Sequence, residues 1–436
     1  MIPIIPVADI ASINSPAPVT GGPTIAGLKT SPPLSLYIHI PWCVKKCPYC
    51  DFNSHALKSK IPEQDYVDAL VADLNADITR FNLNDRPLHS IFIGGGTPSL
   101  FSAQAIESLL SQVLSRFSHN NSQSKSIEIT LEANPGTVEA DKFIGFVKAG
   151  VTRLSIGVQS FESEKLLKLG RIHNVSQAQQ AAQMATDAKS VGLKSFNLDL
   201  MHGLPNQSIE NALDDLKTAI SLKPDHLSWY QLTIEPNTAF HSKPPKLPQD
   251  ETLWNIQDQG FKLLAQAGYK QYEISAFSLV APEKEKEIIN SEQSEQDMQC
   301  QHNLNYWRFG DYLGIGCGAH GKITDVSTGL IQRTVKVKHP KGYLDPNREP
   351  LDHLTTVTND ELPFEYMMNH LRLFSSFTLE DYQQRTGLSI NTILPTLQQA
   401  QQKKLMSCTE SLSTEEKWQV TELGHRYLND LLELFL

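Results

Sequence analysis

The sequence lacks the features that would place it across a membrane, outside the cell or on nucleic acid. No apolar run approaches the roughly 20 residues that a membrane-spanning helix needs. The first 33 residues contain no basic start and no continuous apolar stretch, but they contain seven prolines, which predicts a disordered leader rather than a signal peptide. A net charge of −10 argues against binding nucleic acid through its phosphates, since that requires clustered Lys and Arg.

Cysteine is also scarce, with six residues in a chain of 436. Three of them, Cys43, Cys47 and Cys50, lie within eight positions, whereas the other three are scattered far downstream. In a chain that is not exported, clustered cysteines bind metal or do chemistry more often than they form disulfides. The spacing of these three cysteines is therefore the strongest functional signal in the sequence.

A short apolar run followed by an amphipathic helical stretch repeats six times from residue 34. The runs lie at 34–40, 90–96, 127–135, 153–159, 195–205 and 226–234. Strands and helices in alternation predict parallel strands that are covered by helices. The pattern therefore predicts an α/β fold, either an open doubly wound sheet or a closed or partial barrel.

Composition divides the chain into five parts. These are a disordered leader (1–33), the strand–helix repeats (34–280), a polar insertion (281–299), a Gly-rich connecting segment (300–354) and a C-terminal domain (355–436). The insertion carries six acids and two lysines, and its composition predicts disorder.

The C-terminal domain shows three helical stretches, two short strands separated by a polar turn, and a last helical stretch. This order is typical of a winged-helix module, which usually binds DNA through a basic recognition helix. Residues 355–436 hold six basic against eleven acidic side chains, a net charge of −5. We therefore do not expect this domain to bind DNA.

The Cys43-x-x-x-Cys47-x-x-Cys50 spacing favours an iron–sulfur cluster over the other uses of cysteine. A structural zinc site would need a fourth ligand nearby, and thiol redox chemistry would need only the Cys47–Cys50 pair. An iron–sulfur cube needs four ligands for its irons, so three cysteines leave one iron open to a small molecule.

Polar or Gly-rich residues stand at the C-terminal ends of the predicted strands, which is the edge where parallel α/β folds build their sites. They are Gly94 to Thr97, Glu132, Gln159 and Asp199, and Arg171 follows the fourth strand. Glycines let a ligand approach the backbone, and an arginine can clamp a carboxylate. Alone, the glycines could form only a tight turn, the three polar strand-end residues are more often caps or structural groups, and Arg171 could equally lie on the surface. Together they favour a ligand with hydroxyl and ammonium groups.

The cysteine spacing, with Tyr49 before the last cysteine, resembles the signature of the radical S-adenosylmethionine (SAM) superfamily. There the open iron chelates SAM. The similarity is closer to the oxygen-independent coproporphyrinogen III oxidase family, through "YIHIPWC", "GGGTPS", "LEANPGT", "RLSIGVQSF", "LGRIHN", "DLMHGLP", "HNLNYW" and "YLGIGCGAHG". It runs from about residue 34 to the end. The resemblance implies a partial (β/α)6 TIM-like radical SAM barrel with a C-terminal α+β winged-helix-like domain.

The same resemblance implies the site residues. Cys43, Cys47 and Cys50 would ligate a [4Fe–4S] cluster. The residues that would line SAM are Tyr37, Tyr49, Gly95, Gly96, Thr97, Glu132, Gln159, Arg171, Asp199 and Thr233. Thr233 has the weakest match, because the residues around it differ from the family pattern.

One position separates two branches of the family. The oxidases carry a fourth cysteine two positions after the third, and this chain has Phe52 there. The Cys-Asp-Phe form, with HNxxYW at 302–307, is similar to the haem-chaperone branch. That branch implies a protein that binds haem, passes it to acceptor haem proteins, needs the cluster and SAM, and lacks the decarboxylase activity. The alternatives are the oxidase itself, which decarboxylates coproporphyrinogen III with a 5′-deoxyadenosyl radical, and another radical SAM enzyme with a different substrate.

The chaperone branch also implies the setting in which the protein works. It implies a cytoplasmic protein that attaches to the membrane at most peripherally, with membrane respiratory cytochromes among its acceptors. The oligomeric state of such a protein would depend on the cluster. The sequence does not decide whether the chain is also an enzyme.

Haem is the cofactor for which the sequence is least explicit. Haem iron needs an axial His, Cys, Met or Tyr and an apolar wall. The segment "CQHNLNYWRF" offers Cys300 and His302 as ligands and Trp307 as a flat surface, and "GCGAHG" adds Cys317 and His320. We take His302 as the axial ligand, with Cys300 and His320 as alternatives. A zinc site built from these cysteines and histidines is the competing interpretation.

Overall fold

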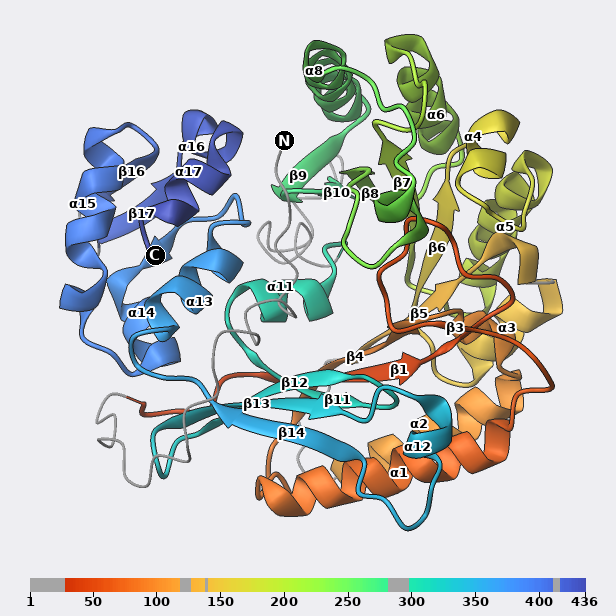
Figure 1. The fold of residues 1–436 in the computed structure, drawn as a ribbon, viewed down its shortest axis with the longest axis horizontal. Coiled ribbons are helices and arrows are strands. Elements are labelled where there is room, and N and C mark those ends of the chain that lie inside the picture. Colours follow the sequence, from red (N-terminus) through yellow and green to blue (C-terminus); the bar gives the residue numbers. More distant parts are fainter. Residues whose placement is uncertain (1–27, 118–126, 138–139, 281–297, 411–415) are drawn as a thin grey trace.

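The computed structural model of this chain describes residues 28–117, 127–137, 140–280, 298–410 and 416–436. Most of the predicted leader and of the predicted insertion at 281–299 therefore lies outside the described residues. The described chain forms a large curved sheet with its helices and a smaller domain beside it (Figure 1).

The six predicted strands form the centre of the sheet. They are β1 (Leu34–Ile40), β4 (Leu88–Gly95), β5 (Glu128–Ala133), β6 (Arg153–Gln159), β7 (Ser195–His202) and β8 (His226–Gln231). Neighbours in this order pair in parallel, so their C-terminal ends share one edge. The runs are apolar and almost continuously buried, as expected for parallel strands covered on both faces. The prediction of a parallel α/β core is confirmed.

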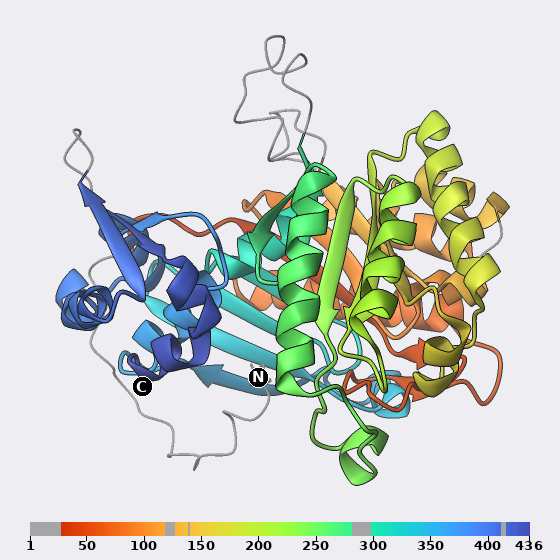
Figure 2. The same cartoon turned by 90° about the horizontal axis from the view of Figure 1, so that it is seen from above.

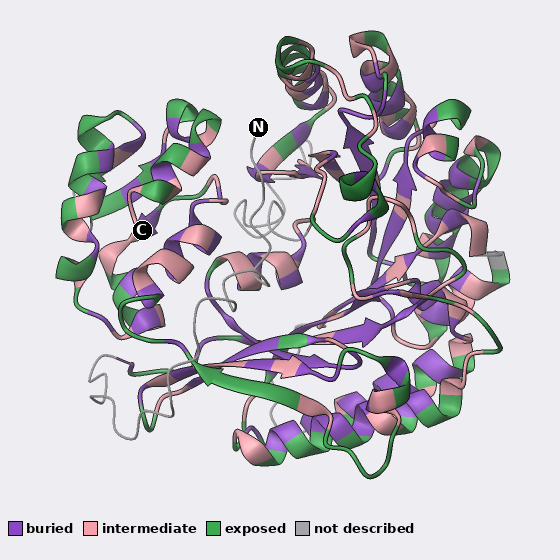
Figure 3. Ribbon diagram, in the orientation of Figure 1, coloured by how far each residue is buried: buried purple, intermediate pink, exposed green. Residues whose placement is uncertain are grey.

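Helices cover the convex side of this sheet (Figures 1 and 3). They are α1 (Glu63–Arg80), α2 (Ala103–Phe117), α3 (Ala140–Lys148), α5 (Val175–Ala188), α6 (Ile209–Ser221) and α8 (Asp250–Gln266). Local sequence fixes where two of them begin, because Asn174 and Ser208 form capping boxes with the first turns of α5 and α6. Aliphatic side chains of the strands and helices pack into one large core, whose burial stabilises the fold.

Further strands extend the sheet on both sides, giving twelve in the described residues. Beyond β8 come β10 (Ala276–Leu279) and β9 (Tyr269–Glu273), both antiparallel. On the other side β11 (Asp311–Ile315) pairs in parallel with β1. It is followed by the antiparallel strands β12 (His320–Asp325), β13 (Leu330–Lys336) and β14 (Leu351–Thr356). The sheet does not close, and β1 is an interior strand.

The segment 300–354 thus carries more structure than the expected connection. It contains helix α11 (Gln301–Trp307) and most of the β11–β14 extension. These strands follow one another through turns rather than alternating with long helices, so the strand–helix pattern that identified the first six strands does not reveal them.

A buried ion cluster ties this extension to helix α1. Lys336 on β13 donates to Asp73 and to Asp77 of α1, and the Nζ–Oδ2 distance to Asp77 is 2.7 Å. Tyr343 donates to Asp73 at 2.7 Å. The Gly316 N–H donates to the same carboxylate, so the cluster also fixes the turn after β11.

We expect Lys336→Met to lower the free energy of unfolding by about 3–5 kcal/mol, because it leaves the buried Asp73 carboxylate without a cation and leaves Asp77 only its pair with Arg80. Urea denaturation followed by circular dichroism measures the change. Lys341→Met removes an exposed lysine nearby and should change stability by less than about 0.5 kcal/mol. Wild-type stability in the Lys336→Met protein would show that the cluster does not hold the extension.

The C-terminal domain has a core of its own. Its elements are α13 (Leu362–His370), β15 (Phe377–Thr378), α14 (Leu379–Thr386), α15 (Leu394–Gln402), β16 (Met406–Glu410), β17 (Glu416–Val420), α16 (Glu422–Arg426) and α17 (Leu428–Glu433). Strands β16 and β17 pair antiparallel as the predicted wing, and Figure 2 shows the domain beside the barrel. In the described parts of the chain, no helix is long and apolar enough to cross a membrane.

Candidate functional site

Half-buried positions on five of the six central strands mark the concave face of the sheet. On these largely buried strands, Tyr37, Phe92, Glu132, Gly157 and Asp199 are half-buried. Tyr37 pairs with Phe92 in the sheet register, and Gly157 pairs with Asp199. Helices cover the convex side, so these positions face the interior of the partial barrel. The fold therefore brings three predicted SAM residues onto one surface.

The three clustered cysteines lie on one loop that directly follows β1. Cys43 ends the two-residue strand β2 (Trp42–Cys43), which pairs with β3 (His55–Ala56), and Cys47 and Cys50 lie between these strands. All three thiols are free and half-buried. Burial raises the pKa of Cys43, and it raises the pKa of Cys50 to about 11. These two groups are therefore neutral thiols at pH 7, and metal binding would release their protons.

A single arginine links the cysteine loop to the sheet. The Nη1 atom of Arg171 donates to the sulfur of Cys47 over 3.6 Å, and Nη2 donates to the Gly157 carbonyl over 2.6 Å. Its Nε–H is buried without a partner. The guanidinium thus places its positive charge against the Cys47 sulfur and keeps a donor for an anionic group such as a carboxylate.

Aromatic packing holds the middle of the loop. Tyr49 joins a small apolar cluster, with its ring centroid 6.4 Å from that of Phe240. The backbone N–H of Phe240 donates to the Pro48 carbonyl at 2.9 Å. Tyr49 is thus placed between two of the three cysteines by contacts with the far side of the barrel.

His39 and Asn53, which the sequence did not single out, hold the end of the loop. The Nε2 atom of His39 bonds the Asn53 carbonyl at 2.8 Å, and its Nδ1 bonds the Tyr37 hydroxyl at 2.9 Å. The Asn53 amide donates to the carbonyls of Cys317 at 2.9 Å and Lys338 at 2.8 Å. The loop is therefore fastened to β1 and to the β11–β14 extension.

The turn at Gly94–Thr97 packs closely against β1 and the start of the cysteine loop. A Cβ atom on Gly96 would lie 2.6 Å from the Trp42 carbonyl oxygen. Gly95 has a φ of +109°, and a Cβ there would lie 2.4 Å from the His39 ring. Glycine is required at both positions for this close approach, which brings the turn within reach of whatever the loop binds.

Two acidic groups face each other on the concave surface. Burial, and secondly the Asp199 carboxylate, raise the pKa of Glu132 to about 7, and burial raises the pKa of Asp199. Glu132 accepts the Gly95 N–H at 3.0 Å, and Asp199 accepts a bond from the Ser155 hydroxyl at 3.0 Å. A ligand with ammonium or hydroxyl groups would stabilise the ionised forms of both.

The remaining predicted SAM residues lie at the ends of β6 and β8. Gln159 has a φ of +71°, a left-handed conformation that is uncommon outside glycine and clusters at functional sites. Its Oε1 accepts the Tyr230 hydroxyl at 2.8 Å. Tyr230 was missed by sequence reasoning, although an aromatic at an inward position of β8 could have indicated it. Thr233 lies half-buried on the loop beyond β8.

His302 lies on α11, which sits between the sheet and the C-terminal domain (Figure 1). The side chain is 8% exposed, and its Nδ1 lies 3.3 Å from the Ser90 hydroxyl. The ring centroid is 5.1 Å from that of Phe92 and 6.4 Å from that of Tyr37. Burial lowers the pKa of His302 to about 3, so the imidazole is neutral, which is the form that binds metal.

The other expected haem residues do not join His302. The Cys317 thiol donates to the Lys338 carbonyl at 2.8 Å, His320 is exposed, and the Cys300 thiol faces Glu128 at 3.7 Å. Trp307 lies beneath the guanidinium of Arg372, 4.3 Å from the ring centroid. The aromatic surface beside His302 is therefore that of Tyr37 and Phe92.

Among the residues that the structure describes, no three His, Cys, Asp or Glu side chains converge as a single metal ion requires. The zinc interpretation is therefore wrong for this part of the chain. The same finding is compatible with an iron–sulfur cube, because each thiolate of a cube binds a different iron. Three thiols on one loop, a cation at one of them and the polar side chains of the concave face fit such a group.

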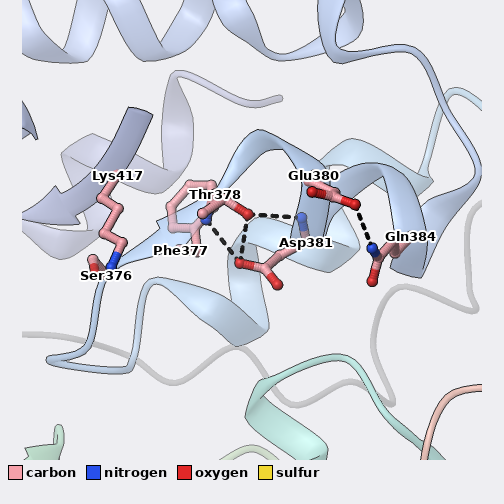
Figure 4. A pocket seen from close by; sticks show the side chains of 7 residues that line it. All are labelled: Ser376, Phe377, Thr378, Glu380, Asp381, Gln384 and Lys417. Carbon is pink, nitrogen blue, oxygen red and sulfur yellow. Dashed lines mark hydrogen bonds between the residues drawn. The ribbon is translucent and has the colours of Figure 1, made fainter. Parts of the chain in front are cut away.

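A surface pocket of about 370 Å³ lies on the C-terminal domain (Figure 4). It is lined by Ser376, Phe377, Thr378, Glu380, Asp381, Gln384 and Lys417. Thr378 and Asp381 bond each other's backbone in the capping box that starts α14, and Gln384 donates to Glu380. Because the helix uses these polar groups, we assign no ligand to this pocket.

Comparison with known proteins places the chain in a family. Residues 37–216 match the model of the radical SAM superfamily, and residues 357–425 match that of the HemN C-terminal domain. The chain is 54% identical to the heme chaperone HemW of Haemophilus influenzae, over 93% of this chain and 98% of that protein. The chain belongs to the HemW family. The HemW protein of Escherichia coli is 52% identical to it, again over 93% of this chain and 98% of the relative.

A solved structure shows the same fold as this HemW-family chain. Coproporphyrinogen III oxidase (HemN) from Escherichia coli, described as a radical SAM enzyme, matches with a TM-score of 0.72. The match covers 94% of this chain and 91% of that one, at 24% sequence identity. It confirms the predicted fold class, and at this identity it carries no further argument.

Proposed function

We propose that this protein is a haem chaperone, which binds haem and transfers it to acceptor haem proteins on a scaffold that uses a [4Fe–4S] cluster and SAM. The observation that carries the proposal is the 52–54% identity to heme chaperones named HemW over 93% of the chain. The oxidase alternative has only a likeness of fold. At the position of the oxidase's fourth cysteine, Phe52 is 57% exposed and offers no metal ligand.

In this proposal Cys43, Cys47 and Cys50 hold the cluster, which when bound supplies a redox centre with one open iron. The chain's own groups prepare that site. Arg171 donates a hydrogen bond to the Cys47 sulfur, and the bonds of His39 and Asn53 hold the loop in one conformation. Such a fixed loop needs little reorganisation when the metal enters.

SAM would lie on the concave face beside the cysteine loop. The residues proposed to line it are Tyr37, Tyr49, Gly95, Gly96, Thr97, Glu132, Gln159, Arg171, Asp199 and Thr233. Arg171 has a free donor suited to a carboxylate, and Glu132 and Asp199 offer acceptors for ammonium and hydroxyl groups.

We expect the affinity for SAM to rise with pH between about 6 and 8. Below the Glu132 pKa of about 7 the carboxyl is protonated and cannot balance a cationic ligand; above it the group is ionised. If only the ionised form binds, the affinity changes by up to about tenfold over this range. Equilibrium dialysis of SAM with reconstituted protein at three pH values measures it. Glu132→Gln should flatten the pH dependence of SAM affinity, whereas the exposed control Glu164→Gln should leave it unchanged. A Glu132→Gln protein with the same pH dependence as the wild type would show that Glu132 does not control SAM binding.

We propose His302 as the axial ligand of haem, bound through Nε2 because Nδ1 bonds Ser90. The neighbouring rings of Tyr37 and Phe92 would supply the apolar wall that a porphyrin needs. Cys300 and His320 remain the alternative ligands.

We further propose that the protein works in the cytoplasm and delivers haem to membrane respiratory cytochromes through peripheral association with the membrane.

One experiment tests the function as a whole. Anaerobically reconstituted protein is incubated with coproporphyrinogen III, SAM and a reductant, and in parallel it is titrated with haem. A haem spectrum without protoporphyrinogen supports the chaperone, whereas formation of protoporphyrinogen makes the protein an oxidase.

A further inference from the structure

A hydrogen-bonded chain of buried polar side chains leads away from Asp199 and has no role in the function proposed so far. It consists of Asn197 on β7, His226 on β8 and Tyr272 on β9. The Asn197 amide nitrogen donates to Asp199 at 2.7 Å, its oxygen bonds His226 Nδ1 at 2.7 Å, and His226 Nε2 bonds the Tyr272 hydroxyl at 2.8 Å. The backbone N–H of Cys300 then donates to the Tyr272 oxygen at 3.1 Å.

The partners fix the direction of every bond in this chain. Asn197 gives its N–H groups to Asp199 and to Ser155, so its oxygen must accept the proton of His226 Nδ1. The His226 Nε2 atom is then an acceptor and receives the Tyr272 hydroxyl proton. The Tyr272 oxygen in turn accepts the Cys300 N–H. All four donors therefore point toward the Asp199 carboxylate, and bonds aligned in this way strengthen one another.

The two ends of the chain lie at two different parts of the proposed site. Asp199 is on the concave face, where SAM would bind. Cys300 is the N-cap of α11, the helix that carries His302. The first turn of this helix is also held by Glu128, which accepts the N–H groups of Gln301 and His302, each at 3.1 Å.

All three members of this hydrogen-bonded chain are deeply buried. Asn197 and His226 are each 1% exposed, and Tyr272 is 6% exposed. A donor or acceptor left unpaired at such a depth costs about 1–3 kcal/mol, so a change at one end favours a compensating change along the chain. Tyr272 also reaches the C-terminal domain, since its carbonyl accepts the Phe374 N–H at 3.1 Å.

We infer that Asn197, His226 and Tyr272 are positioning residues that couple the occupancy of the Asp199 site to the placement of α11. The inference rests on the proposed function, and it assigns SAM the role of setting how tightly haem is held. A ligand that neutralises the Asp199 carboxylate makes it a weaker acceptor for the Asn197 amide. The successive hydrogen bonds through His226 and Tyr272 then change, including the bond from the Cys300 N–H to the Tyr272 hydroxyl. Because coupling between two binding sites is reciprocal, haem must change the affinity for SAM by the same factor.

The coupling is measured on the cluster-loaded full-length protein. The affinity for hemin is determined with and without SAM, and the affinity for SAM with and without hemin. We expect the two affinity ratios to be equal to each other. Each should lie between about 5 and 150. Tyr272→Phe removes only the hydroxyl and should bring both ratios close to one. Tyr269→Phe is the matched control, because Tyr269 lies on the same strand and is 5% exposed. Its hydroxyl donates to the Pro224 carbonyl, which is not part of the Asn197–His226–Tyr272 hydrogen-bond network.

A second readout does not depend on haem. Hydrogen exchange of the α11 amides should change when SAM is added to the wild type and to Tyr269→Phe, and should not change in Tyr272→Phe. Hemin binding without coupling in either assay overturns the inference and leaves the chaperone function standing. An exchange response without any hemin binding overturns the function and leaves the link to α11 standing. A Tyr272→Phe protein that couples like the wild type, or a Tyr269→Phe protein that loses coupling, also overturns the inference.

Discussion

Cys47→Ala should abolish the brown chromophore that anaerobic reconstitution gives the wild-type protein. A [4Fe–4S] cube needs a thiolate on each of three irons when a small molecule takes the fourth, and two cysteines cannot satisfy this. The variant also removes the sulfur that Arg171 contacts at 3.6 Å. Iron and sulfide content should fall from about four of each per chain to near zero. Chemical analysis and the absorption spectrum measure this.

The matched control is Cys408→Ala, which removes a cysteine on strand β16 of the C-terminal domain. It should keep its full iron content and colour. Cys43→Ala and Cys50→Ala should behave like Cys47→Ala, because all three lie on the same loop. Full iron and sulfide in the Cys47→Ala protein would remove the cluster from this loop.

His302→Ala should shift or abolish the Soret band of haem-loaded protein and weaken haem retention on gel filtration at least about tenfold, a loss of about 1.4 kcal/mol. The reason is the loss of a neutral imidazole placed between Ser90 and Phe92. The absorption spectrum and hemin titration measure both effects. SAM affinity, measured on the same protein, shows whether the barrel is intact.

Three variants serve as controls for this ligand. Cys300→Ala and His320→Ala should keep the wild-type spectrum, and so should His370→Ala, which removes a buried histidine stacked on Tyr366 in the C-terminal domain. Loss of the Soret band in Cys300→Ala or His320→Ala alone would move the ligand and keep the chaperone function. Loss in His370→Ala alone would place haem on the C-terminal domain.

The sequence predicted the parts of this molecule that repeat. The six central strands follow from apolar runs separated by helical stretches, and the rule that parallel strands end at one edge placed Glu132, Gln159 and Asp199 together. The β11–β14 extension was not predicted, because its strands follow one another through turns. Trp307 was expected beside His302, yet five residues along a helix of 3.6 per turn rotate a side chain by about 140°, which turns it toward Arg372.

The residues that fasten the site were the hardest to predict, since their importance depends on distant partners. Asn53 is an ordinary polar residue until the fold brings the carbonyls of Cys317 and Lys338 to its amide. Tyr272 is likewise one aromatic among several, and only the fold places its hydroxyl between His226 and Cys300. No local pattern in the sequence indicates either contact.

The attachment of Asn53 sets an order of events during synthesis. The Asn53 amide bonds a carbonyl that lies 285 positions later in the chain. Strand β1 likewise cannot pair with β11 until that later strand has been synthesised. At a translation rate of 5–20 residues per second, the ribosome needs about 15–60 s to make the intervening chain. During that time the cysteine loop exists without its fastening, and its thiols are open to oxidation. Under the proposed function, iron and sulfide are therefore best delivered to the finished chain rather than to the nascent one.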